Sequence, residues 1–228
     1  MRTKDGVQRL AVDLRFRPNA DAAHWQGIFD SLARWEPRLQ PFEWFEASDP
    51  SQRRQPWSAE AASGLFQRCA NHVAMARIVE GAQDDTGAIT VRVRKAEIVM
   101  LIALPHPPVA LDTYFKRLLE HLQPDFLPAV GMMFDLDAGH DAEVIFQGLR
   151  GLHQVPPYFY LDAAAVNVVG REKLQTAPAT VLDMPGGGLL LVSRPDPWAR
   201  RIGDELRRAR AVEQHLGISV QTPLVLAG

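Results

Sequence analysis

The densest group of residues that could carry chemistry is the acidic segment Asp135-Leu-Asp-Ala-Gly-His-Asp-Ala-Glu143. Carboxylates together with an imidazole are the groups that a hard cation or a carboxylate-based hydrolase would use. Their spacing matches neither an EF-hand loop nor a zinc motif. A local interpretation accounts for most of them, because a strand can end at Asp135, a turn can use Gly139, and Asp141 can cap a following helix. We therefore expect no functional metal and no cofactor, and a metal-dependent hydrolase centred on residues 135–143 stays as the alternative.

The other reactive residue types do not form a known catalytic signature. The chain has seven histidines, which are scattered and form no HExxH pair. Cys69 is expected on the inward side of a helix, where a thiol acts as a small hydrophobe. The glycines at 186–188 lead into Leu189-Leu-Leu-Val instead of the lysine of a phosphate loop, so a hairpin turn is the better interpretation. No GxSxG elbow is present.

Composition limits the classes of partner and compartment. The chain has 228 residues, of which 46% are hydrophobic, and this fits a single domain spanning residues 1–228. A net charge of −2 makes direct nucleic-acid binding a poor expectation, and the arginines of the last helix are interrupted by Asp204 and Glu205. A single cysteine excludes an internal disulfide and fits the cytoplasm, while the absence of a signal-like or 18-residue apolar stretch predicts no membrane association.

Hydrophobic periodicity predicts the elements that position these groups. Apolar residues alternate over Leu10–Phe16, which predicts a strand with one buried and one solvent-exposed face. Helical spacing predicts a helix from Trp25 to Trp35 capped by Asn19, and a long helix over residues 59–80 capped by Ser58. Further strands are expected over residues 42–45, 89–93, 98–104, 129–136 and 158–169, with a hairpin of 180–182 and 189–192. Further helices are expected over residues 111–122 and 141–149, with a last one that begins at Asp196-Pro197, turns Leu206 inward and closes at Gly217.

This order predicts an α+β fold: a single domain with a mixed or largely antiparallel sheet and about four packed helices.

Three segments of the C-terminal third carry a family resemblance: Val169-Gly-Arg-Glu-Lys-Leu-Gln-Thr-Ala-Pro-Ala, Asp183-Met-Pro-Gly-Gly-Gly and Pro195-Asp-Pro. They resemble the C-terminal portion of bacterial polymorphic-toxin immunity proteins, in particular the immunity protein 52 family. That family is associated with toxins of the restriction-endonuclease-like class, some of them delivered by type VI secretion. The resemblance implies a cytoplasmic antidote and not an enzyme, whose partner is a cognate toxin effector. The antidote would block the active site of the toxin or its access to substrate.

Such a partner would be bound by exposed aromatic and acidic side chains, because aromatic residues anchor interfaces and carboxylates oppose the basic groups of a nuclease. A first candidate patch contains Glu43, Trp44, Glu46, Asp49 and Trp57, and a second contains Asp135, Asp137 and Asp141. Core packing is the commoner role of a tryptophan and is the alternative for the aromatic members. The oligomeric state is open, and an adaptor of a secretion system is the remaining alternative function.

Overall fold

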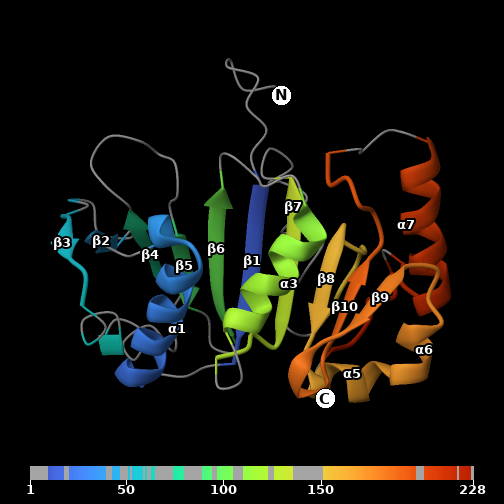
Figure 1. Ribbon diagram of the computed structural model, residues 1–228, viewed down its shortest axis with the longest axis horizontal. Helices are drawn as coiled ribbons and strands as arrows, with labels where there is room; N and C mark the ends of the chain where they lie inside the picture. The colour runs from blue at the N-terminus through green and yellow to red at the C-terminus, as the bar shows by residue number, and fades with distance from the viewer. Residues whose placement is uncertain are drawn as a thin grey trace.

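A single antiparallel sheet runs through the molecule (Figure 1). The computed structural model describes residues 10–17, 21–39, 43–46, 51, 53–58, 60, 63–64, 74–79, 89–93, 97–104, 110–122, 126–135, 151–198, 203–219 and 221–226. Its 10 strands have the order β3-β2-β4-β5-β6-β1-β7-β8-β10-β9, and each neighbouring pair in the described part of the chain is antiparallel. The strands are β1 (Leu10–Phe16), β2 (Glu43–Glu46), β3 (Gln55–Pro56), β4 (Ala74–Val79), β5 (Ile89–Val93), β6 (Ile98–Leu104), β7 (Val130–Asp135), β8 (Tyr158–Leu161), β9 (Thr180–Asp183) and β10 (Leu189–Val192).

Helices pack on both faces of this sheet. The α-helices of the described residues are α1 (Ala22–Trp35), α3 (Leu111–His121), α5 (Ala163–Val169), α6 (Arg171–Gln175) and α7 (Gly203–Leu216). Together with the antiparallel sheet they confirm the predicted α+β class. Among the described helices, none is long and apolar enough to cross a bilayer.

Two hydrophobic cores lie on opposite faces because successive residues of a strand point to opposite sides. The front core joins Leu10, Val12 and Leu14 of β1 to the buried faces of α1 and α3, which lie in front of the sheet in Figure 1. The back core contains Ala11 of β1 with apolar residues of α5, α6, α7 and the C-terminal segment. The sheet is therefore the middle layer, and its central strands are covered on both sides.

Helix α1 follows the predicted spacing but begins at a different cap. Trp25, Ile28, Phe29 and Leu32 are buried, as their helical periodicity indicated. The cap is Asp21, whose Oδ1 accepts a hydrogen bond from the backbone N–H of Ala23 at 3.0 Å, so the expectation of Asn19 was wrong. An aspartate at this position satisfies one of the backbone donors that the first turn leaves unpaired.

The long helix expected over residues 59–80 is wrong in its C-terminal part. Glu60, Ser63 and Gly64 are helical, but Ala74–Val79 is strand β4. This strand has a partner on each side, β2 and β5, and the backbone hydrogen bonds of two ladders outweigh a weak local preference for helix. Cys69 lies outside the described residues.

The expectation of a solvent-exposed face on β1 is also wrong, because all seven of its residues are buried. Asp13 and Arg15 are each only 4% exposed. The Arg15 guanidinium donates to both carboxylate oxygens of Asp13 at 3.1 Å and to both of Glu97 at 3.3 Å. These three side chains, called here the buried ion cluster, carry one positive and two negative charges, and the pairing of the guanidinium with both carboxylates offsets part of the cost of removing them from water.

Two C-terminal elements differ from their predicted bounds. The strand expected over residues 158–169 ends at Leu161, because Asp162 accepts from the N–H of Ala165 at 2.8 Å and starts α5. The last helix begins at Gly203 and not at Asp196, and Leu206 is 37% exposed instead of inward.

Two further C-terminal predictions are confirmed. Gly217 follows the last helix with a φ of 73°, and β9 and β10 form the predicted hairpin. The turn of this hairpin has positive φ at Gly186 and Gly187, which glycine adopts without strain. The helix expected over residues 141–149 lies outside the described residues.

Candidate functional site

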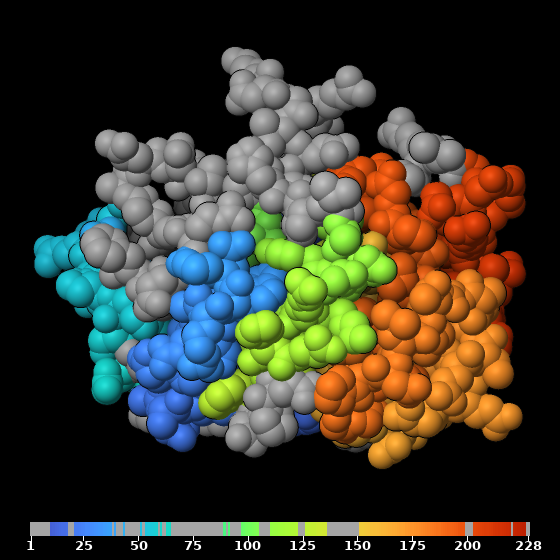
Figure 2. Space-filling model, in the orientation of Figure 1, coloured from blue at the N-terminus to red at the C-terminus, as the bar shows by residue number. Residues whose placement is uncertain are grey.

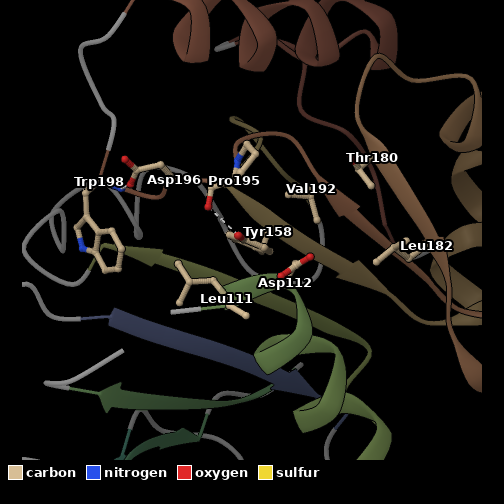
Figure 3. Close-up of a pocket in the computed structure, with 10 residues that line it drawn as sticks. Leu111, Asp112, Tyr158, Thr180, Leu182, Val192, Pro195, Asp196 and Trp198 are labelled. Atoms are coloured by element: carbon tan, nitrogen blue, oxygen red, sulfur yellow. Dashed lines mark hydrogen bonds between the residues drawn. The ribbon is translucent and has the colours of Figure 1, made fainter. Parts of the chain in front are cut away.

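A cavity of about 540 Å³ opens between the N-terminal end of α3 and the strands β8, β10 and β9 (Figure 3). Its lining comes from three places in the chain: Ala110, Leu111 and Asp112 at α3, Tyr158, Thr180, Leu182 and Val192 on the strands, and Pro195, Asp196 and Trp198 after β10. Cavities of a few hundred Å³ are the usual size of sites for small organic groups. The cavity is therefore large enough to hold a small organic group.

The cavity lies where α3 meets the C-terminal part of the sheet. On the face shown in Figure 2, α3 lies directly beside the segments of the C-terminal part of the chain. Tyr158 and Val192 belong to the front core, and Leu182 and Trp198 pack against its margin. The cavity therefore lies at the margin of the front core.

Two hydrogen bonds to backbone carbonyls hold the segment after β10 in place. The Tyr158 hydroxyl donates to the carbonyl oxygen of Pro195 at 2.7 Å, and the Ser193 hydroxyl donates to that of Pro156 at 2.8 Å. Asp196 Oδ1 accepts from the backbone N–H of Trp198 at 2.8 Å, which forms a local turn. The rim that carries Asp196 and Trp198 is therefore fixed against β8.

The cavity is acidic. Asp112 and Asp196 are exposed, and Figure 3 shows their side chains on either side of the hydrogen bond between Tyr158 and Pro195. Burial raises the pKa of the Tyr158 hydroxyl, and the negative charges of Asp112, Asp196 and Glu205 raise it further. The phenol therefore stays protonated at neutral pH and acts as a hydrogen-bond donor.

A third carboxylate that acts on Tyr158 is that of Glu205, in the first turn of α7. Its Oε1 lies 3.6 Å from the Arg208 guanidinium, and its side chain is 21% exposed. Its Oε2 is buried and has no hydrogen-bond partner among the described residues. Within the described ranges, no three His, Cys, Asp or Glu side chains converge closely enough to hold a metal ion.

The first candidate patch lies at the other end of the sheet from this cavity. Glu43, Trp44 and Glu46 share strand β2, next to the edge strand β3. Glu43 forms an ion pair with Arg54 at 3.6 Å. The Trp57 ring packs edge-on against Phe29 with centroids 4.4 Å apart, so this tryptophan serves the front core in part.

Of the second candidate patch, the structure describes Asp135. Asp135 ends β7 and pairs with Leu10, whereas Asp49, Asp137 and Asp141 lie outside the described residues. Five strand spacings separate β2 from β7 in the sheet, or about 24 Å at roughly 4.8 Å per strand. The described members of the first patch on β2 and Asp135 on β7 therefore lie at separate places in the sheet.

The sequence did not indicate the cavity. Pro195-Asp-Pro was noted as part of a family pattern and Asp196 as a helix start, while Asp112 and Tyr158 carried no signal of their own. An acidic residue in the first turn of a helix and a tyrosine in a strand are common for structural reasons.

Comparison with known proteins gives a fold and not a family. No protein-family model matches the sequence, and no curated protein matches it. The solved structure of the Pseudomonas aeruginosa T6SS protein PA0821 is similar to the chain, with a TM-score of 0.60 and 14% identity over 100% of this chain and 82% of that one. The chain therefore shares the fold of a protein described as belonging to a type VI secretion system (T6SS).

A second solved structure contains the toxic C-terminal tip of CdiA from Pseudomonas aeruginosa in complex with its immune protein. Its TM-score to this chain is 0.41 with 10% identity, over 58% of this chain and 88% of that one. This similarity is too low to establish a shared fold.

Proposed function

We propose that this protein is an immunity protein of a type VI secretion system, which binds a cognate toxin effector and neutralises it without catalysing a reaction. The observation that carries the proposal is the fold, which matches a T6SS protein over the whole length of this chain. The resemblance of residues 169–179 and 183–188 to the immunity protein 52 family supports the same role. We place the protein in the cytoplasm, since its single cysteine requires no oxidising compartment.

The toxin in this proposal is a restriction-endonuclease-like nuclease. A nuclease binds its anionic substrate through basic residues, and an acidic antidote surface can oppose them. The cavity supplies acidic and aromatic groups of this kind, since Asp112, Asp196 and Trp198 line it. The patches of Glu43, Trp44, Glu46, Asp49 and Trp57 and of Asp135, Asp137 and Asp141 remain candidate contact surfaces. Binding at any of them would block the active site of the toxin or its access to substrate.

Co-expression tests the proposal. The candidate toxin encoded beside this gene is induced in a bacterial host with this protein or with an empty vector, and growth is followed. We expect growth only when this protein is present, and we expect the two proteins to co-purify at a fixed ratio. The control is a toxin from an unrelated immunity pair, which this protein should not neutralise. Arrest of growth in the presence of well-expressed, folded protein would contradict the proposal for that pair.

A further inference from the structure

We propose that the cavity between α3 and β8-β10-β9 binds an arginine side chain presented by a partner protein. On the proposed function, on which this inference rests, that partner is the toxin. The cavity would then be the specific contact that recognises a basic residue of the toxin surface.

The first argument is the arrangement of charge around the opening. Asp112 reaches the cavity from the first turn of α3 and Asp196 from the segment after β10, so the two carboxylates approach it from different walls (Figure 3). Both are exposed and can be reached by a partner. A planar guanidinium has several donors and can serve acceptors in more than one direction.

The second argument is that the charge is not neutralised by the cavity's own lining. The lining residues of the described chain include Asp112 and Asp196 but no lysine or arginine. Among the described cations nearby in sequence, Lys116 pairs with Glu120 at 3.7 Å and Arg208 pairs with Glu205. A cationic group of a partner would therefore complement the negative electrostatic potential of the cavity, whereas an anionic group would be repelled.

The third argument is the apolar and aromatic part of the lining. Trp198, which is half-buried, contributes an aromatic ring to the lining beside the almost fully buried Tyr158, and a guanidinium is favourably placed over the face of such a ring. Leu111, Leu182 and Val192 provide an apolar surface for the methylene groups of a long side chain. A volume of about 540 Å³ exceeds what one ion or water needs, at roughly 30 Å³ for a water, and suits a whole side chain.

A small probe tests this chemistry without the toxin. The indole N–H signals of the 15N-labelled protein are followed by NMR during titration with arginine amide, and the Trp198 signal is assigned with Trp198→Phe. Citrulline amide, which is uncharged and nearly the same shape, is the matched probe. We expect arginine amide to shift the Trp198 signal in a saturable way and citrulline amide to leave it unchanged. Equal shifts with both probes, or none with either, would overturn the inference.

The matched variant is Asp112→Asn combined with Asp196→Asn, because an asparagine keeps the shape of each side chain. At position 196 it can still accept from the backbone N–H of Trp198. Glu172→Gln, an exposed charge removal on α6 outside the cavity lining, is the control. We expect the double variant to lose the response to arginine amide and Glu172→Gln to retain it. Retention of the response by the double variant, with its fold shown intact by circular dichroism, would overturn the inference.

The same variants separate this inference from the proposed function. With the toxin, we expect the double variant to bind at least about tenfold more weakly than wild type, as for loss of charge-assisted hydrogen bonds. Toxin binding that is equal in the two proteins would overturn the inference and leave the immunity function standing. A saturable arginine response in a protein that binds no candidate toxin would support the cavity's chemistry and refute the immunity function for that pair.

Discussion

Replacing Arg15 by methionine should be among the most destabilising single changes in the chain. The side chains of the buried ion cluster are almost inaccessible, at 5% for Arg15, 6% for Asp13 and 2% for Glu97. Without the guanidinium, two carboxylates remain buried with their principal cation removed. Removal of one partner from a buried pair costs about 3–5 kcal/mol, because it leaves charge in a medium of low polarity. This loss approaches the whole free energy of unfolding of a typical domain, about 5–15 kcal/mol.

Urea unfolding followed by circular dichroism measures this loss. The control is Lys116→Met, which removes an exposed i,i+4 ion pair with Glu120 and should cost only about 0.3–0.5 kcal/mol. Replacing Asp13, Arg15 and Glu97 together by apolar residues of similar size should recover about 2 kcal/mol or more relative to Arg15→Met alone, because the two carboxylates are then no longer buried without the guanidinium. A loss for Arg15→Met that is no larger than the loss for Lys116→Met would refute this account of the cluster.

Three further predictions concern a cap, a turn and two tyrosines. Asp21→Ala should lower the free energy of unfolding by about 1 kcal/mol and Asp21→Asn by much less, because asparagine also caps helices; equal losses in urea unfolding would argue against the cap. Gly188→Ala should lower the free energy of unfolding by about 1–3 kcal/mol, since the added Cβ would lie 2.7 Å from a backbone oxygen of β8. In the control Gly203→Ala the nearest atom to the added Cβ is 3.5 Å away, so no loss is expected. Similar melting temperatures for the two variants would contradict this prediction. Burial raises the pKa of Tyr158 and Tyr160 above the ordinary 10.0, so the unfolded chain loses these two protons at a lower pH than the folded protein does. The free energy of unfolding should therefore fall above pH 10, by up to about 1.4 kcal/mol per pH unit for each tyrosine. Tyr160→Phe should show a shallower decline between pH 10 and 11 in urea unfolding, and an unchanged slope would count against the assignment.

Period-two alternation predicted β1 and β5, a nearly continuous apolar run predicted β6, and helical spacing predicted α1 and α3, because each of these signals lies within the residues of the element itself. They were not sufficient to predict how deeply β1 is buried. Arg15 and Asp13 look like solvent-facing residues until Glu97, 82 positions away from Arg15, completes the ion cluster. Long-range compensation of this kind has no local signature.

Segment Ala74–Val79 shows the same limit for secondary structure. Its apolar residues fit the stripe of a helix that continues from the preceding residues, and its strand conformation depends on β2 and β5 as neighbours. Sheet partners at both edges decide the state of a short apolar segment more strongly than its own preference does.

The candidate cavity could not be predicted from the sequence, because its lining depends on the topology of the sheet. Asp112 and Tyr158 are 46 positions apart, and they meet at one cavity because α3 crosses the front of the sheet and β8 lies two strands from the β9 edge. Of the two candidate patches, the described residues Glu43, Trp44 and Glu46 lie on β2, whereas Asp135 lies on β7, five strand positions away. Which residues share a site depends on the order of the strands in the sheet, and this order cannot be predicted from the residues of a single segment.

The most direct test of the immunity function is to titrate this protein into a reaction that contains the purified candidate toxin and its nucleic-acid substrate. The account predicts that cleavage falls in proportion to added protein and ends when the two are present in a fixed molar ratio, with the substrate itself left unbound by this protein. Cleavage that continues unchanged in excess of the folded protein would contradict the account.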